Sequence, residues 1–236
     1  MTDDLTTPHD RFEARLHRRS ASLLKQQVLD QERGQFERTL AWARHDASLE
    51  RSAALVVSAR RRFVLGAAKS FTYASLLAAD LSAAVANVTL IDGTIVRPLD
   101  VLSDVRDSDV LVAVSLSRYR KYTVDFAVPF VEAGGTLVLI TDSPDAPLVQ
   151  HAAESIIVDT TSASSSNSPI AVALVIHILA TLTTASAKGA GRRLLQRDRL
   201  AESLGLYVDN APEHNAPEHN APGRNEPTPD EQGAAE

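Results

Sequence analysis

A run of apolar residues without polar alternation, VLVAV at residues 110–114, constrains the fold of this chain more than any other stretch. Such a run is typical of a central parallel strand that is covered on both faces. Two hydroxyl side chains, Ser115 and Ser117, follow it directly. In open α/β sheets, ligands sit at the carboxyl ends of the strands, where a following helix directs the positive end of its dipole at them. We therefore expect an anion site here, and phosphate matches it best.

Composition and length indicate an ordinary globular protein. The chain has 236 residues, 44% hydrophobic and 23% charged, which favours one α/β domain with appendages. It contains no cysteine, which excludes disulfides, thiolate catalysis and zinc–sulfur sites. The N-terminal sequence MTDDLTTPHD is polar and lacks an apolar signal core. We therefore expect a cytoplasmic protein.

Charge is distributed unevenly along the chain. Residues 209–236 hold seven acidic residues and one Arg, and so account for the whole net charge of −6. Residues 11–62 carry twelve Lys or Arg against six Asp or Glu. A basic front and an acidic tail can indicate nucleic-acid binding, but Arg-rich helices are more often solvated faces. The tail repeats the motif NAPEH, and its Pro, Asn and Glu content predicts disorder.

Short apolar runs alternate with helical segments, which predicts βαβ units and a parallel sheet. The expected strands are residues 62–67, 87–92, 109–115, 136–141 and 155–159. The expected helices that follow the first strand are residues 70–86, 101–106, 122–133, 146–153, 170–187 and 190–204. With right-handed crossovers, these elements form a flavodoxin-like, three-layer αβα sandwich with a five-stranded parallel sheet.

Two helices are expected ahead of the first strand, at residues 10–31 and 35–58, with Gly34 as the break between them. Residues 170–187 are too short and too polar for a membrane span, and we expect no membrane contact. The lone His177 in this helix is interpreted as a packed core residue rather than a base. The resulting division is a helical segment at 1–58, the main domain at 59–189, a C-terminal helix at 190–208 and a disordered acidic tail at 209–236.

Hydroxyl-rich loops follow the first and the third expected strand. The first loop is GAAKS at residues 66–70, and the second is SLSRYRKYT at residues 115–123. A phosphate dianion needs several donors at once, and serine hydroxyls together with helix-end N–H groups supply them. Arg118, Arg120 and Lys121 add positive charge. Serines also cap helices routinely, so the pattern alone is not decisive.

At these residues the sequence resembles the SIS (sugar isomerase) domain, and more narrowly the sugar-sensing half of RpiR/MurR-type bacterial regulators. The first loop resembles the G-x-G-x-S turn of that family, with Gly66 and Ser70 kept and Ala68 in place of the second glycine. Residues 115–123 resemble the SxSRYSRET element. The segments AGGTLVLITDS at 133–143 and APL nearby resemble the family's "Ga-vi-iTDs…SPLa" segment.

The resemblance implies a phosphosugar-binding module. The residues that it places at the phosphate or the neighbouring hydroxyls are Ser70, Ser115, Ser117 and Thr123. Arg120 stands where the regulator motif has a serine, which makes it a candidate hydrogen-bond donor to the phosphate. Tyr122 stands where the motif has a glutamate. Related isomerases move a proton with a carboxylate or a His, and the central loop supplies neither. Asp92, Asp142 and Glu154 are interpreted as strand-end and helix-capping residues.

The resemblance covers the sensor and not the helix-turn-helix DNA reader of the regulators. We therefore expect a sensor that binds a sugar phosphate, forms a homodimer or tetramer, uses no cofactor or metal and does not bind DNA directly on its own. Two alternatives stay open. The first is an aldose–ketose phosphate isomerase that takes its base from another segment or subunit, and the second is a degenerate SIS scaffold that mediates assembly alone.

Overall fold

The computed structural model describes residues 7–15 and 20–208, so the predicted acidic tail lies outside the described residues. Its sheet has five parallel strands in the order β2-β1-β3-β4-β5. The strands are β1 Arg61–Gly66, β2 Val88–Ile91, β3 Asp109–Val114, β4 Thr136–Thr141 and β5 Glu154–Ile157. Every predicted strand is present with small shifts at its ends, and the predicted five-stranded parallel sheet is confirmed.

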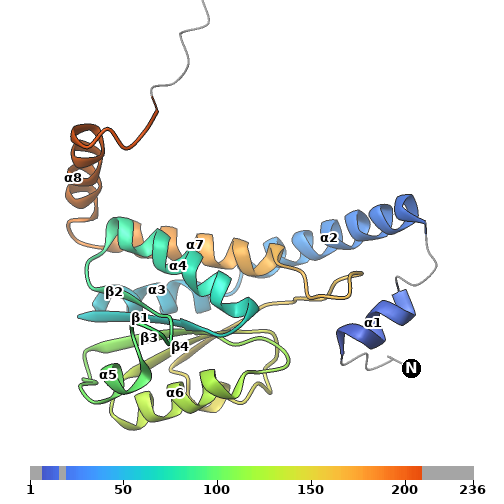
Figure 1. Ribbon diagram of the computed structural model, residues 1–236, viewed down its shortest axis with the longest axis horizontal. Helices are drawn as coiled ribbons and strands as arrows, with labels where there is room; N and C mark the ends of the chain where they lie inside the picture. The colour runs from blue at the N-terminus through green and yellow to red at the C-terminus, as the bar shows by residue number, and fades with distance from the viewer. Residues whose placement is uncertain (1–6, 16–19, 209–236) are drawn as a thin grey trace, which may run out of the picture. The chain divides into compact units, whose positions relative to one another are not determined.

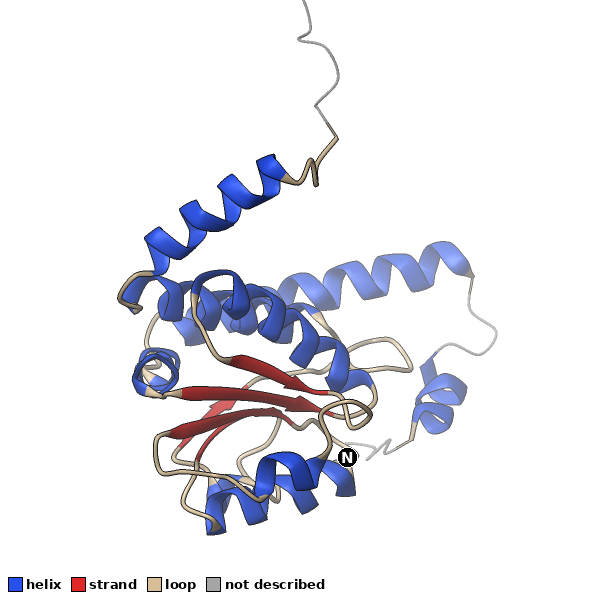
Figure 2. Ribbon diagram, turned by 60° about the vertical axis from the view of Figure 1, so that its left-hand side comes forward, coloured by secondary structure: helices blue, strands red, loops and turns tan. Residues whose placement is uncertain are grey.

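Helices cover both faces of the sheet (Figures 1 and 2). The helices α3 (Ser48–Ser58), α4 (Lys69–Ala84) and α7 (Ile170–Ser186) contribute to the core on one face. On the other face, α5 (Pro98–Leu102) and α6 (Lys121–Glu132) contribute to a second core. This is the three-layer αβα sandwich that the alternation of apolar runs and helices predicts.

The middle strand β3 is buried along its whole length. Val110, Val112 and Val114 point into the core beneath α3, α4 and α7, whereas Leu111 and Ala113 point into the core beneath α5 and α6. Successive side chains of a strand face opposite sides of the sheet, so a strand that is covered twice needs an apolar residue at every position. The same rule explains the apolar run TLVLIT of β4.

The helices ahead of β1 differ from the prediction. The described residues form α1 (Pro8–Arg15), α2 (Ala21–Ala43) and α3, and Gly34 lies inside α2 instead of ending a helix. A glycine inside a helix costs about 1 kcal/mol relative to Ala, which the rest of a long helix can offset. The break falls after Ala43 instead, where the Asp46 carboxylate accepts the Ser48 N–H at 2.7 Å and starts α3.

Three smaller expectations are also wrong. The helix predicted at 101–106 begins earlier as α5, because Pro98 occupies its first turn, where proline is favoured. The helix predicted at 146–153 is only a short 3₁₀ turn at Val149–His151, since Pro147 lacks an N–H and disfavours a helical residue before it. His177 is exposed on α7 and is not a packed core residue.

The C-terminal part of the chain continues from α7 into α8 (Ala190–Ser203). The chain divides into two compact units, Met1–Asp198 and Arg199–Glu236, and the division falls within this helix. Within residues 7–15 and 20–208, no single helix is long and apolar enough to cross a membrane. The pair α7 and α8 reaches that length together, but the chain bends between them.

An ion pair joins the beginnings of the two central strands. Arg61 of β1 donates from Nε to Asp109 Oδ1 at 3.0 Å and from Nη2 to Oδ2 at 2.5 Å. The Asp109 side chain is completely buried and also accepts the Arg106 N–H at 2.9 Å. Arg61 forms a second ion pair with Asp104, whose side chain is 55% exposed. The two carboxylates thus share one guanidinium but differ in burial.

This difference predicts unequal costs of removal. Asp109→Ala should lower the free energy of unfolding by about 3 kcal/mol, since it leaves a guanidinium and an N–H without their buried acceptor. Asp104→Ala should cost less than about 1 kcal/mol, because exposed ion pairs contribute little. Urea denaturation of both variants measures the two costs, and equal costs would contradict the assignment.

Candidate functional site

The loops that follow β1 and β3 lie side by side, because these strands are neighbours in a parallel sheet. A cavity of about 190 Å³ opens between them at the carboxyl edge of the sheet. The helices α4 and α6 begin at this edge and direct the positive ends of their dipoles toward it. The lining residues are Pro8, Arg11, Ala67, Ala68, Lys69, Ser70, Tyr73, Leu116, Ser117, Arg118, Arg120, Ser166 and Asn167.

The first loop is a tight connection that brings α4 close to the end of β1. A Cβ atom at Gly66 would lie 2.3 Å from the carbonyl oxygen of Ser70, so glycine is required there. Ala68 has φ 53° and ψ −124°, a backbone conformation that favours glycine. Ala68 is the residue that replaces the second glycine of the motif, and the turn keeps a glycine-like backbone without the glycine.

The central loop is held by the carboxylate of Asp142, which follows β4. The Ser117 N–H donates to both carboxylate oxygens, at 3.0 and 2.9 Å, and the Tyr119 hydroxyl donates to Oδ1 at 3.2 Å. Burial and the Asp142 charge raise the pKa of Tyr119. Thr160 Oγ1 donates to the same carboxylate at 3.3 Å. Asp142 therefore positions the loop, which is a more specific role than the strand-end cap expected of it.

Three of the five predicted site residues line the cavity together. Ser70 is the second residue of α4, Ser117 is exposed on the central loop, and Arg120 precedes α6. The other two do not line it. Ser115 is buried, with its carbonyl accepting the Thr141 hydroxyl at 2.7 Å, and Thr123 is buried in the first turn of α6.

Several lining residues are not among the predicted site residues. Lys69 Nζ donates to the carbonyl of Asn167 at 2.6 Å, and Arg11 Nη1 donates to the Asn167 side-chain oxygen at 2.6 Å. Burial lowers the pKa of Lys69, and the nearby charge of Arg11 adds to the effect. Asn167 belongs to a polar loop and Arg11 to α1, so nothing in their local sequence relates them to the strand ends.

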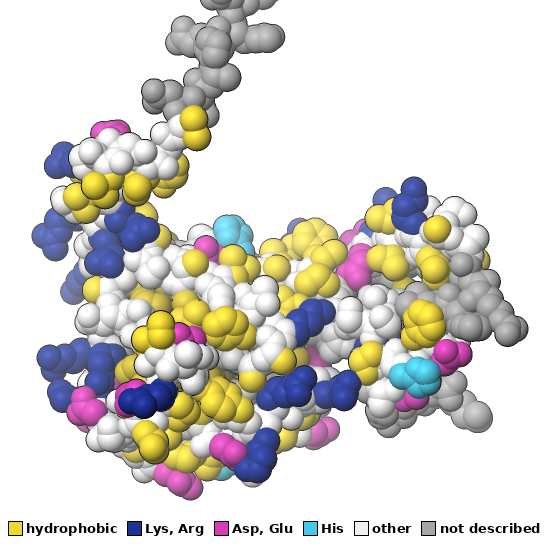
Figure 3. Space-filling model, viewed as in Figure 1, with side chains coloured by type: hydrophobic (Ala, Val, Ile, Leu, Met, Phe, Trp, Pro, Cys, Tyr) yellow, Lys and Arg dark blue, Asp and Glu magenta, His cyan; other side chains and the backbone are white. Residues whose placement is uncertain are grey.

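The cavity has a strongly positive lining. Arg11, Lys69, Arg118 and Arg120 contribute cations, and no Asp, Glu or His is among the described residues that line it. Figure 3 shows Lys and Arg side chains grouped over the end of the sheet where α4 begins. Lys121 forms an ion pair with Asp125 at 2.6 Å and is not part of the lining. Chemically, this arrangement offers hydroxyl donors and fixed positive charge to an anion.

The remaining acidic candidates have structural partners. Asp92 accepts the N–H groups of Thr94, Ile95 and Val96 at 2.8 to 3.0 Å, as a strand-end residue should. These hydrogen bonds lower the pKa of Asp92. Glu154 forms an ion pair with Arg51 at 2.6 Å instead of capping a helix. Within the described part of the chain, no group of three or more His, Asp or Glu side chains could hold a metal ion.

A family model described as the SIS domain matches residues 55–187, which is more than half of the sequence. The chain belongs to the SIS domain family. This finding confirms the resemblance to the SIS domain that the loop motifs indicate. None of the curated proteins matches the sequence significantly.

Solved structures share the fold of this SIS domain at low sequence identity. The sugar isomerase domain of an RpiR transcription factor from Sphaerobacter thermophilus has a TM-score of 0.68 and 22% identity, covering 76% of this chain and 98% of that one. Vibrio vulnificus NanR, complexed with ManNAc-6P, has a TM-score of 0.66 and 16% identity, covering 84% and 74%. The c3406 protein of Escherichia coli CFT073 has a TM-score of 0.59 and 15% identity, covering 77% and 100%.

The backbone of Ala68 predicts a stabilising substitution. Ala68→Gly should raise the free energy of unfolding by about 1 kcal/mol, because relief of about 1–3 kcal/mol of strain exceeds the entropic cost of about 0.5–1 kcal/mol of a new glycine. The matched control is Ala67→Gly in the same loop, whose φ is not in the positive range. That control should lower stability. Thermal and urea unfolding measure both changes, and destabilisation by Ala68→Gly would contradict the strained backbone.

Proposed function

We propose that this SIS-domain protein binds a phosphorylated sugar, or a related carbohydrate derivative, in the cavity at the carboxyl edge of its sheet. One observation carries the proposal: the described lining combines serine hydroxyls with four cationic side chains and contains no carboxylate. Charge-assisted hydrogen bonds to an anion are about twice as strong as neutral ones. An anionic ligand with hydroxyl groups therefore fits this lining better than a neutral sugar.

The phosphate is assigned to the part of the cavity between the two loops. Ser70 and Ser117 approach it from the two loops, and Arg120 adds a guanidinium beside Ser117. We propose these three residues as the phosphate contacts. Contacts from Ser115 and Thr123 remain predictions of the resemblance, because neither residue lines the cavity. Their burial beside the loops gives them a supporting role in this arrangement.

The size of the cavity supports a small ligand. Its volume of about 190 Å³ is below the range of about 300–1,000 Å³ typical of drug-sized sites. A monosaccharide phosphate suits such a space, whereas a nucleotide or an oligosaccharide would extend out of it. The complex of NanR with ManNAc-6P gives a precedent for a ligand of this kind in a protein of similar fold.

We favour a sensor of the RpiR type over an isomerase. Proton transfer between neighbouring sugar carbons needs a base within hydrogen-bond reach, and the described lining provides no carboxylate or imidazole. An isomerase would have to take that base from another segment or subunit. Homo-oligomerisation and the absence of direct DNA binding remain predictions. A scaffold without a ligand is the outcome if no sugar phosphate binds.

The proposal predicts stabilisation by sugar phosphates. A thermal-shift screen should find at least one sugar phosphate that raises the melting temperature, because a ligand that binds only the folded state stabilises it by mass action. The matching unphosphorylated sugars and inorganic phosphate alone are the controls. If no sugar phosphate raises the melting temperature, the protein is a scaffold rather than a sensor.

Substitutions at Ser117 test the position of the phosphate. Ser117→Ala should weaken binding of the best ligand by about tenfold to a hundredfold, since a hydrogen bond to a charged group is worth about 1.5–3 kcal/mol. Ser117→Asp should abolish binding, because it places a like charge against the phosphate. Isothermal titration calorimetry measures both, with melting temperatures as the control for folding. Unchanged affinity of Ser117→Asp would move the site away from the central loop.

Arg120 offers a separate test, because Arg120→Ser restores the residue of the regulator motif and removes a cation. If Arg120 donates to the phosphate, the affinity should fall by about tenfold or more. Lys121→Ser is the matched control, since Lys121 is engaged by Asp125 and does not line the cavity. A rise in affinity for Arg120→Ser would show that the guanidinium obstructs the cavity.

A further inference from the structure

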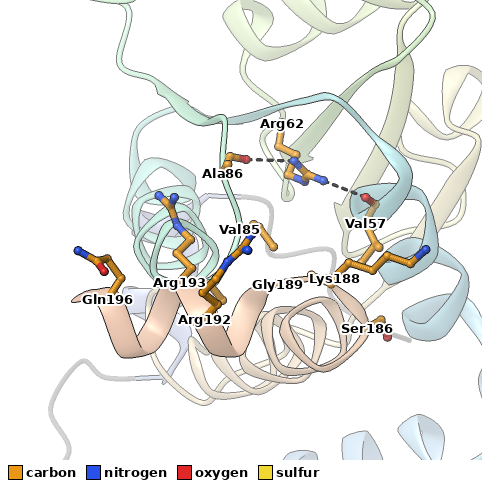
Figure 4. Close-up of a pocket in the computed structure, with 12 residues that line it drawn as sticks. Val57, Arg62, Val85, Ala86, Ser186, Lys188, Gly189, Arg192, Arg193 and Gln196 are labelled. Atoms are coloured by element: carbon orange, nitrogen blue, oxygen red, sulfur yellow. Dashed lines mark hydrogen bonds between the residues drawn. The ribbon is translucent and has the colours of Figure 1, made fainter. Parts of the chain in front are cut away.

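A second and larger hollow lies at the opposite, amino edge of the sheet, and we call it the amino-edge groove. Its volume is about 690 Å³. The ends of α3 and α4, the start of β1 and the connection from α7 to α8 form its walls, as Figure 4 shows. Its lining residues are Val57, Arg62, Ala84, Val85, Ala86, Ser186, Ala187, Lys188, Gly189, Arg192, Arg193 and Gln196.

The guanidinium of Arg62 forms the inner wall of the amino-edge groove. Arg62 is only 8% exposed and donates from Nε to the carbonyl of Val56 at 2.7 Å, from Nη1 to Ala86 at 3.0 Å and from Nη2 to Val57 at 2.9 Å. Burial lowers its pKa. These bonds use three of the five N–H donors of a guanidinium. No carboxylate forms an ion pair with Arg62 among the described residues.

Three more cationic side chains line the groove with Arg62. Lys188, Arg192 and Arg193 line the groove, and the described lining contains no Asp or Glu. In Figure 4, Arg192 and Arg193 extend from α8 toward the chain at Val85 and Ala86. Within the described part of the chain, the hydrogen bonds of the Arg193 side chain are two long ones, of 3.4 Å, to the Ser82 carbonyl. Arg62, Arg192 and Arg193 therefore give the groove a positive charge that an anion would offset.

The remaining lining is mostly apolar, with Ser186 and Gln196 as its other polar side chains. Val57 and Val85, together with several alanines, provide wall positions that cannot donate hydrogen bonds from their side chains. The carbonyl ends of α3 and α4 would oppose an anion through the helix dipoles. Arg62 donates to the Val56 and Val57 carbonyls at the end of α3 and so offsets the repulsion there. An occupant that combines several negative charges with a flat or apolar part would match this lining.

We propose that the amino-edge groove binds a small organic polyphosphate of the nucleoside diphosphate class. The phosphoryl groups would bind Arg192, Arg193 and the free N–H donors of Arg62, while the base would lie against Val57 and Val85. Arginine suits this role because its planar fork pairs with phosphate in a bidentate manner. The volume of about 690 Å³ accommodates such a ligand and lies in the usual range for bound small molecules.

Calorimetric titration of the full chain with ADP, tripolyphosphate and adenosine tests the proposal. ADP and tripolyphosphate should bind, and adenosine should not. The double variant Arg192→Ala/Arg193→Ala should weaken ADP binding by at least about tenfold, because it removes two charge-assisted contacts. The matched control is Arg197→Ala/Arg199→Ala, which removes the same charge from α8 outside the groove lining. It should change the affinity by less than about twofold, because neither residue lines the groove and salt screens exposed charges.

Four outcomes would overturn the proposal. These are no binding of either phosphate probe, equal losses in the two double variants, adenosine binding as tightly as ADP, and duplex DNA displacing ADP at lower concentration. The last result would make the groove a nucleic-acid surface. Ser117→Asp should leave ADP binding unchanged, because Ser117 lies at the carboxyl edge. Failure of the polyphosphate proposal is thus distinguishable from failure of the sugar-phosphate proposal.

Discussion

Burial of β3 on both faces is the constraint on which the rest of this SIS domain depends. Its five apolar side chains divide between two cores, and each core needs its own layer of helices. The neighbouring strands run parallel to β3, because each helix crosses over the sheet and returns the chain to the edge where the previous strand began. All strands therefore end at one edge, and the loops after β1 and β3 meet there. The position of the candidate site is a consequence of how the core is built.

The site combines this general position with a specific electrostatic arrangement. Asp142 holds the central loop through the Ser117 N–H and the Tyr119 hydroxyl, so a carboxylate lies behind a site that we assign to an anion. Nearby negative charge opposes anion binding. The four cations of the lining lie at the cavity itself, whereas Asp142 is not among the lining residues. Asp142 thus positions the central loop, whereas the cations of the lining attract the ligand.

The sequence contained enough information for the sheet, because strand identity depends on local apolar runs that are read directly. It was less informative about helix ends, where Gly34 indicated a break that a long helix tolerates and Pro147 ended a segment that looked helical. In the site, Ser70, Ser117 and Arg120 could be predicted, because they follow predicted strands in the sequence. Arg11 and Asn167 were not, since only tertiary packing brings residues 156 positions apart within hydrogen-bond distance.

Arg62 also affects how cooperatively the segments around it unfold. In a chain without cysteine, this side chain acts as a noncovalent cross-link, since it joins the end of α3, the start of β1 and the turn before β2. A lysine could not replace it, because a single ammonium group lacks the planar fork that reaches three carbonyls. These three segments are therefore bound into one cooperative unit, whose backbone amides should share a single opening free energy in hydrogen exchange.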